Sequence, residues 1–96
     1  MVERTLTVRA RLGLHARAAA KLVRVASAFA SNVELKRIDS GMSADAKSIL
    51  SVLMLAASRG TALQASVEGE DEEAAMTAID QLFADGFGEL EPESAR

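Results

Sequence analysis

The sequence has 96 residues, the length of one domain, and 49% of them are apolar, which is enough for a single core. It contains no cysteine, which excludes disulfides, thiolate zinc sites and thiol nucleophiles. The net charge of −3 is unevenly distributed: residues 1–40 hold eight Lys or Arg and three Asp or Glu, whereas residues 41–96 hold three and eleven. The basic half suits an anionic ligand or an acidic protein surface, and three phenylalanines without Tyr or Trp do not favour a nucleic-acid partner.

The sequence shows no targeting or membrane-spanning segment. The N-terminus carries charges from residue 3 and lacks the apolar region of a signal peptide. The longest apolar run, VLMLAA at 52–57, is too short to span a bilayer. We therefore expect a soluble, cytoplasmic protein without membrane insertion.

The first forty residues predict a strand, a helix and a second strand. Residues 2–10 alternate apolar and polar side chains, which is typical of a half-buried strand. Gly13 then breaks the pattern, and helical spacing from Ala16 to about Ala30 predicts a helix that residues 31–32 end. A further strand is expected at 33–38. The predicted inward positions of the first strand are Val2, Arg4, Leu6, Val8 and Ala10.

The remaining residues predict two strands and two helices. The DSG turn at 39–41 and a short strand at 42–44 complete a hairpin, and a helix follows at about 46–58 with Gly60 as its stop. Alternation at 61–68 predicts a fourth strand. Residues 69–86 predict a third helix with an acidic first turn and an apolar stripe of Ala75, Ile79, Leu82 and Phe83.

The predicted order β-α-β-β-α-β-α indicates an α+β fold. We expect an open-faced two-layer sandwich, in which three helices cover one face of a four-stranded antiparallel-type sheet. Residues 1–88 are predicted to form this single domain and residues 89–96 an acidic C-terminal tail, with the chain from Phe87 onward resembling a frayed end.

The only histidine lies at the predicted start of the first helix. As N-cap residue, His15 can accept a hydrogen bond from the Arg17 amide through a ring nitrogen. The first-turn amides and the helix dipole favour an anion there, and Arg17 adds a planar cation that binds phosphate bidentately. Imidazole is also a good nucleophile near neutral pH, and positive surroundings favour its neutral form. These features predict a site that accepts, holds and returns a phosphoryl group.

The alternatives to a phosphoryl site at this histidine are a surface or packing role, a metal site and a hydrolase. A lone histidine in a small domain is often a surface or packing residue. A metal site is disfavoured, because the sequence has no second His, no Cys and no paired carboxylate nearby. A Ser-His-Asp hydrolase is disfavoured because no nucleophile elbow is present. No cofactor is expected.

Three sequence blocks resemble a known family. GLHARAAAKLV, SADAKSILSVLML and EGEDEEAA resemble HPr, the histidine phosphocarrier of the bacterial phosphoenolpyruvate-dependent sugar phosphotransferase system, over residues 2 to about 85. The resemblance implies that His15 is phosphorylated on Nδ1 and that Arg17 contacts the phosphate, in a cradle of Ala16, Arg17 and Ala18. Enzyme I would be the donor and EIIA domains of sugar permeases the acceptors. Ala18 replaces the usual proline of the family, for which we expect altered transfer rates and retained function.

The second predicted helix is more apolar than a helix buried on one side requires. Ile49, Val52, Leu53 and Ala56 can face the core, which leaves Leu50, Met54 and Leu55 for other faces. Either the helix is more deeply covered or it forms an interface. The resemblance favours an interface for partner docking, formed by Ala16, Ala20, Arg24, Ile49, Leu50, Leu53 and Met54.

Ser48, at the start of that helix, has two interpretations. It is a helix-initiating serine, or it matches the serine that HPr kinase/phosphorylase modifies in many family members. Two functional alternatives also stay open: a regulatory HPr paralogue of a nitrogen-related phosphorelay, and a small ligand-sensing α+β module.

Overall fold

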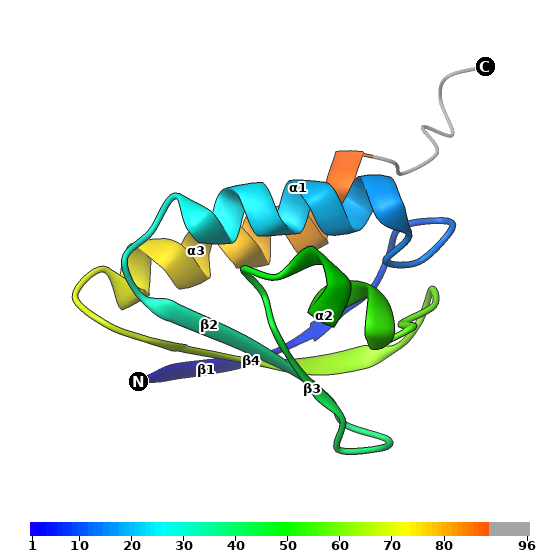
Figure 1. Ribbon diagram of the computed structural model, residues 1–96, viewed down its shortest axis with the longest axis horizontal. Coiled ribbons are helices and arrows are strands. Elements are labelled where there is room, and N and C mark those ends of the chain that lie inside the picture. Colours follow the sequence, from blue (N-terminus) through cyan, green and yellow to red (C-terminus); the bar gives the residue numbers. More distant parts are fainter. Residues whose placement is uncertain (89–96) are drawn as a thin grey trace.

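The computed structural model describes residues 1–88, which form a sheet and a helical layer in the predicted chain order (Figure 1). The predicted tail, residues 89–96, lies outside the described residues. The strands are β1 (Val2–Thr7), β2 (Asn32–Arg37), β3 (Ser43–Asp45) and β4 (Ala62–Glu68). The helices are α1 (Ala16–Ser27), α2 (Ile49–Met54) and α3 (Glu72–Ala84), and the 3₁₀ turn η1 (Gly86–Gly88) follows α3.

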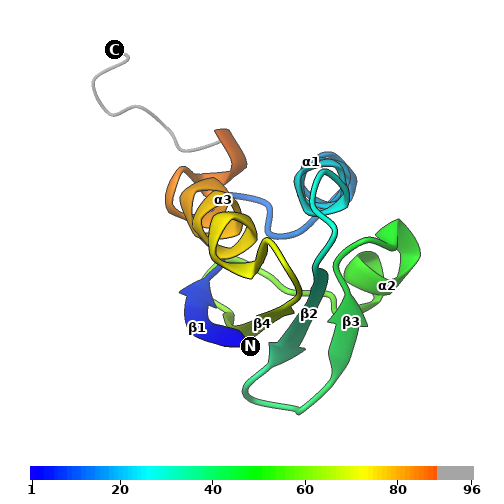
Figure 2. The same cartoon turned by 90° about the vertical axis from the view of Figure 1, so that its left-hand side faces the viewer.

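The sheet has the strand order β1-β4-β2-β3, and each neighbouring pair is antiparallel. Figure 2 shows all three helices on one face of the sheet and the other face open. The inward side chains of β4 are buried as predicted, and α1 packs between α2 and α3. The α+β open-faced sandwich is therefore confirmed. Its fully buried larger side chains include Leu22, Leu35, Leu63, Met76, Ile79 and Phe83.

The first strand is shorter than predicted, and one of its inward positions is wrong. Pairing with β4 ends at Thr7, although Val8 still bonds Gly60 and Thr61 across the connection. Arg4 is not buried; its guanidinium reaches Asp80 on α3 at 2.6 Å. A charged side chain at a core-facing position avoids desolvation by extending to solvent and an ion-pair partner.

Helix α1 ends at Ser27, three residues before the predicted end at Ala30. The Asp71 carboxylate accepts hydrogen bonds from the backbone amides of Ala30 and Ser31, both at 2.9 Å, and so holds the chain out of the helix. Asp71 lies 40 residues further along the chain, so no local pattern indicated this end.

Helix α2 is much shorter than the predicted 46–58. It begins after Ser48, and its last residues turn at Ala56, which has a φ of 49°, well before the predicted stop at Gly60. The predicted faces change accordingly. Leu55, expected outside the core, is 1% exposed, whereas Ile49, expected inside, is 41% exposed and Ala56 is exposed. The chain leaves the helix at Leu55 and directs that side chain inward.

The C-terminal end of the described chain is part of the core. The stripe of α3 is buried at Ala75, Ile79 and Phe83 and partly buried at Leu82. Phe87 is fully buried, with its ring in edge contact with Phe83 at a centroid distance of 4.8 Å. The expectation of a frayed end is therefore wrong for residues 87–88, because η1 folds this ring back against α3 and α1.

Candidate functional site

The single histidine caps the N-terminus of α1, as predicted. His15 has an extended backbone (φ −78°, ψ −178°), and its Nδ1 accepts a hydrogen bond from the Arg17 amide at 3.3 Å. A nitrogen that accepts must carry a lone pair, so in this arrangement the ring proton is on Nε2. The lone pair of Nδ1 is thereby directed at the amides that begin the helix.

The loop before His15 is held against the chain that follows α2. The Leu14 amide donates to the Ala57 carbonyl at 2.8 Å, and the Leu14 side chain is buried. Gly13 has a φ of 74°, and a Cβ there would lie 2.5 Å from the Ala57 oxygen. Glycine is required for both its left-handed backbone and this close approach. Two segments more than 40 residues apart therefore fix the position of the imidazole.

The first turn of α1 presents backbone donors next to the ring. The Ala19 amide bonds the His15 carbonyl at 2.8 Å, which is the first regular bond of the helix. The amides of Ala16 and Ala18, within residues 1–88, have no hydrogen-bond acceptor, as expected for the first turn of a helix. Of the predicted cradle residues, Arg17 bonds Nδ1 through its amide, and Ala16 and Ala18 lie in the same helix turn. Ala16 is exposed, and the Ala18 side chain is fully buried.

An open surface depression surrounds the imidazole. Arg11, Leu12, His15 and Arg17 line it. The His15 side chain is half-buried and Arg17 is exposed, so both are accessible from solvent. Leu12, 72% exposed at the rim, was not singled out from the sequence, because an apolar residue in a loop has no periodic signal. The depression combines a nucleophilic ring with two cations and an apolar edge.

Two cations of the basic half serve the fold instead of the site. The Arg9 guanidinium donates to the Ala84 carbonyl at 2.7 Å, and the Lys21 ammonium donates to the Phe87 carbonyl at 2.8 Å. Ala84 is the last residue of α3, where positive charge is favourable, and Phe87 lies in η1. These two cations are thus bound within the fold and do not line the depression around His15.

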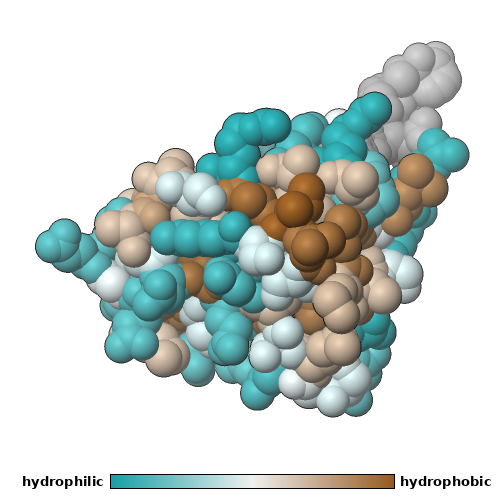
Figure 3. Space-filling model, viewed as in Figure 1, coloured by the Kyte–Doolittle hydropathy of each residue, from teal (hydrophilic) through white to brown (hydrophobic). Residues whose placement is uncertain are grey.

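An apolar surface lies on α2 beside the N-terminal half of α1. Figure 3 shows brown side chains gathered over these two helices. Leu50 and Met54 are 70% and 69% exposed, and Ile49 is exposed as well. Leu53 is partly buried against the core, and on α1 Ala20 is half-buried and Arg24 is exposed. We call the seven predicted residues Ala16, Ala20, Arg24, Ile49, Leu50, Leu53 and Met54 the docking patch.

Ser48 caps the N-terminus of α2. Its hydroxyl oxygen accepts a hydrogen bond from the Ser51 amide at 3.3 Å, and the side chain is half-buried. The helix-initiating role considered for this serine is therefore observed. The hydroxyl lies one residue before Ile49 of the docking patch.

No group of three or more His, Cys, Asp or Glu is placed to hold a metal ion within residues 1–88. None of the helices there has the length and apolar character needed to cross a membrane.

Comparisons with known proteins agree on one family. Residues 2–85 match the family model described as the PTS HPr component phosphorylation site. The chain is 49% identical over 89 residues to phosphocarrier protein HPr of Xylella fastidiosa strain Temecula1, covering 93% of this chain and 98% of that protein. It is 46% identical over 91 residues to phosphocarrier protein HPr of Cupriavidus necator, covering 95% and 100%. The crystal structure of HPr-C-His from Thermoanaerobacter tengcongensis superposes with a TM-score of 0.87 at 38% identity, covering 93% and 98%.

Proposed function

The chain belongs to the HPr family and is a phosphoryl carrier of the phosphotransferase system, and from this premise we propose that Nδ1 of His15 carries the phosphoryl group. The observation that supports this assignment is the position of Nδ1, whose lone pair faces the first-turn amides of α1. A phosphoryl group bonded to Nδ1 would end the hydrogen bond between that nitrogen and the Arg17 amide. One phosphoryl oxygen would then accept the hydrogen bond from the amide instead.

The transfer step needs no proton movement at the reacting nitrogen. The Nδ1 lone pair forms the new N–P bond while the bond between phosphorus and the donor group breaks, and the donor keeps that electron pair. Nε2 retains its proton, so the product is a phosphohistidine with an N–H at Nε2. The reverse step transfers the group to a nucleophile of the acceptor and regenerates neutral His15. The protein is consumed and regenerated stoichiometrically, as a carrier and not an enzyme.

The dianionic phosphoryl group is stabilised by fixed dipoles and one mobile cation. The amides of Ala16, Arg17 and Ala18 are aligned by the helix before the group arrives, so little reorganisation is needed. The Arg17 guanidinium is exposed and bonds no residue among 1–88, which leaves its donors available for two phosphoryl oxygens. The group is therefore held strongly enough to persist and remains accessible to an acceptor.

The donor is proposed to be Enzyme I and the acceptors EIIA domains of sugar permeases, all of them meeting the carrier in the cytoplasm. Each partner must bring its own reactive group to the depression, and the docking patch provides an apolar surface next to it. An apolar centre with Arg24 at its side suits a partner with an apolar surface and an acidic margin. No nucleic-acid partner is proposed.

Alanine at position 18, in place of the usual proline of the family, is proposed to affect the rate of phosphoryl transfer. Its amide has no acceptor within residues 1–88, so proline, which lacks that amide hydrogen, would remove no bond of the unphosphorylated protein. With alanine, the amide is one more donor for the phosphoryl group. We expect Ala18→Pro to fold normally and to change the transfer rate without abolishing it, as measured with Enzyme I.

Ser48 is proposed as a regulatory phosphorylation site for an HPr kinase/phosphorylase. Phosphorylation would add a charge of about −1.5 to −2, as at other phosphoserines. This charge would lie beside Ile49 of the docking patch. It would repel an acidic partner without refolding α2. Ser48→Asp is expected to raise the KM for Enzyme I, while Ser48→Asn, a neutral helix cap, leaves it near the wild-type value.

One experiment tests the carrier function. The protein is incubated with phosphoenolpyruvate and Enzyme I, and its mass is measured before and after mild acid treatment. We expect an acid-labile gain of one phosphoryl group in the wild type and none in His15→Ala. An equal gain in His15→Ala, or no gain in the wild type, contradicts the proposal and leaves the ligand-sensing module as the better hypothesis.

The regulatory paralogue shares this site, so it must be distinguished by the acceptor. Phosphorylated protein is mixed separately with EIIA domains of sugar permeases and with the corresponding domain of a nitrogen-related relay. Faster loss of the phosphoryl group to the sugar-permease domains supports the uptake function, and faster loss to the other domain supports the paralogue.

A further inference from the structure

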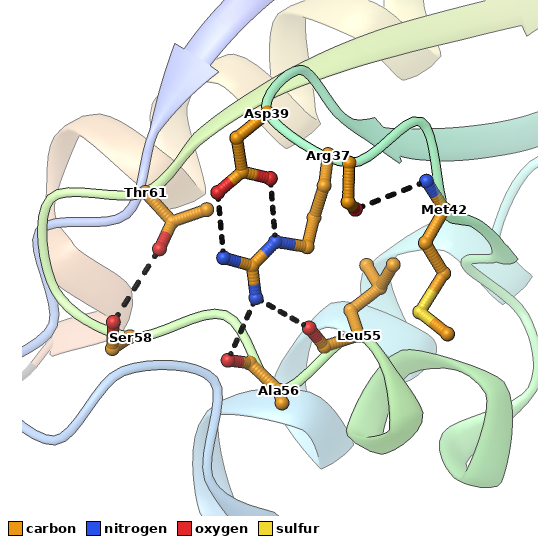
Figure 4. Close-up of polar contacts among 8 residues, drawn as sticks. Arg37, Asp39, Met42, Leu55, Ala56, Ser58 and Thr61 are labelled. Atoms are coloured by element: carbon orange, nitrogen blue, oxygen red, sulfur yellow. Dashed lines mark hydrogen bonds and ion pairs between the residues drawn. The ribbon is translucent and has the colours of Figure 1, made fainter.

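A guanidinium group on the sheet binds the C-terminal end of α2. One terminal nitrogen of Arg37, the last residue of β2, donates to the carbonyls of Leu55 and Ala56 at 2.8 and 3.1 Å (Figure 4). Its other two nitrogens donate to the two carboxylate oxygens of Asp39 at 2.9 and 2.8 Å. This bidentate pair fixes the plane of the guanidinium and lowers the pKa of the Asp39 carboxyl.

The segment held by Arg37 has a strained backbone. Ala56 has a φ of 49°, in the left-handed region that alanine rarely adopts and glycine adopts readily. Such a conformation persists only where the surrounding structure enforces it. Here the enforcing contacts include the two hydrogen bonds from Arg37, which bind the carbonyls on either side of the Ala56 Cα.

The strained segment continues directly into the support of the histidine. The next residue, Ala57, accepts the hydrogen bond from the Leu14 amide, and Gly13 packs against Ala57 and Ser58. Leu14 immediately precedes His15. A continuous set of contacts therefore joins the Arg37 guanidinium, the turn after α2, the Leu14 amide and the imidazole, although Arg37 does not line the depression.

We propose that Arg37 is a positioning residue for phosphoryl transfer: by holding the turn after α2, it sets where Leu14 and therefore Nδ1 of His15 lie relative to the first-turn amides. This inference rests on the proposed function. A simple helix-capping role would change only stability or the presentation of α2, whereas the positioning role changes the chemical step at His15.

The principal test compares Arg37→Met with Arg4→Met. Arg4 also has a carboxylate partner, Asp80, but that pair joins β1 to α3 and, within residues 1–88, makes no hydrogen bond or ion pair with the histidine loop, so it is a matched control. With Enzyme I and phosphoenolpyruvate, Arg37→Met is expected to lower kcat by about three- to tenfold with KM within about twofold, since a small misplacement of a reacting group costs this much or more. Arg4→Met should retain the wild-type kcat.

A second readout does not depend on docking. Phosphorylated Arg37→Met, freed of Enzyme I, should hydrolyse at a different rate from the phosphorylated wild type, because the amides around the phosphoryl group are displaced. Adding Ala56→Gly should restore kcat toward the wild-type value, because glycine adopts the required φ without Arg37. If Arg37→Met does not fold, Asp39→Ala, which only releases the guanidinium, should show the same changes to a smaller extent.

Several outcomes would overturn the inference. These are a folded Arg37→Met with wild-type kcat and hydrolysis rate, a rise in KM with kcat unchanged, and no restoration by Ala56→Gly. A wild type that Enzyme I fails to phosphorylate would instead contradict the proposed function, so the two failures are distinguishable.

Discussion

The two helices next to the depression begin in similar ways and in different surroundings. His15 starts α1 and Ser48 starts α2, and each side chain accepts a hydrogen bond from a first-turn amide at 3.3 Å. At α1, Arg11 and Arg17 line the surface around the cap. Just before α2, the Asp45 carboxylate accepts a hydrogen bond from the Lys47 amide. The Lys47 ammonium donates to the Phe29 carbonyl at 2.8 Å.

This difference shows what a capped helix needs in order to hold a phosphoryl group. A cap hydrogen bond stabilises both helices by the same mechanism. Both helices leave first-turn amides without an acceptor in residues 1–88. Only α1, with 12 residues against six, has two cations at its start and a nucleophilic cap. The start of α2 already has an anion in place, so an added phosphate there would meet like charge. This difference agrees with the proposals that His15 at α1 carries the phosphoryl group and that phosphorylation of Ser48 at α2 regulates docking.

Among changes around the imidazole that leave the ring in place, the largest expected effect is on the cation at α1. Arg17→Glu should leave the melting temperature nearly unchanged because the side chain is exposed, and should slow transfer from Enzyme I by about 10²–10³-fold because a preorganised donor becomes a repelling charge. Arg59→Glu, an equal charge change in an exposed turn, is the control. Transfer by Arg17→Glu at the wild-type rate would remove this arginine from the mechanism.

The next effect concerns the loop that positions His15. Gly13→Ala places a methyl group 2.5 Å from the Ala57 oxygen at a φ of 74°, so we expect a loss of about 2–3 kcal/mol in the free energy of unfolding together with slower transfer. Gly41→Ala has a φ of 79° but open space, so it should cost only about 1 kcal/mol and leave transfer unchanged. Urea unfolding and transfer assays check both, and equal losses would show that the close contact does not matter.

Exchanging the caps separates helix stability from chemistry. Ser48→Ala removes a cap and should cost about 1 kcal/mol of stability while transfer continues. His15→Asn keeps a good cap and should change stability by less than about 1 kcal/mol while abolishing transfer. Stability is measured by denaturant unfolding and transfer by the mass assay. Loss of transfer in both variants would mean that the two helix starts do not differ as described.

The smallest effect concerns the far end of α1. Hydrogen bonds from the Ser31 hydroxyl and from the amides of Ala30 and Ser31 hold the pKa of Asp71 below its ordinary value of 3.8. The folded state thus gains stability above that ordinary pKa and loses it as the pH falls through the lower, folded-state value. In urea unfolding between about pH 5 and pH 2, Asp71→Asn should lose less stability than the wild type does. Identical pH profiles would contradict this role.

The sequence was sufficient for much of the fold and for the centre of the site. Alternation and helical spacing are local properties, so they predicted the order of the elements and the inward face of β4 correctly. The N-cap role of His15 also followed from local reasoning, since the cap and the amide it accepts are only two residues apart. The phosphoryl-carrying role of His15 and the roles of Arg17, Ala18, Ser48 and the docking patch remain predictions.

Other features depend on contacts between distant parts of the chain. Arg9 and Lys21 looked like part of the basic surface around His15, but they bind carbonyls more than 60 residues away. The true ends of α1 and α2 depend on Asp71 and Arg37, and the burial of Phe87 depends on a turn after α3. None of these partners can be recognised from neighbouring residues.

The sequence by itself determined which segments are helix or strand and that a ring nitrogen of His15 faces the start of α1, because periodicity and capping act over a few residues. Only the tertiary structure decided which cations line the depression around His15, how exposed α2 is and what holds Leu14 in place. A hydrogen bond between distant segments forms only when packing brings a donor and an acceptor together, and that is a property of the whole fold.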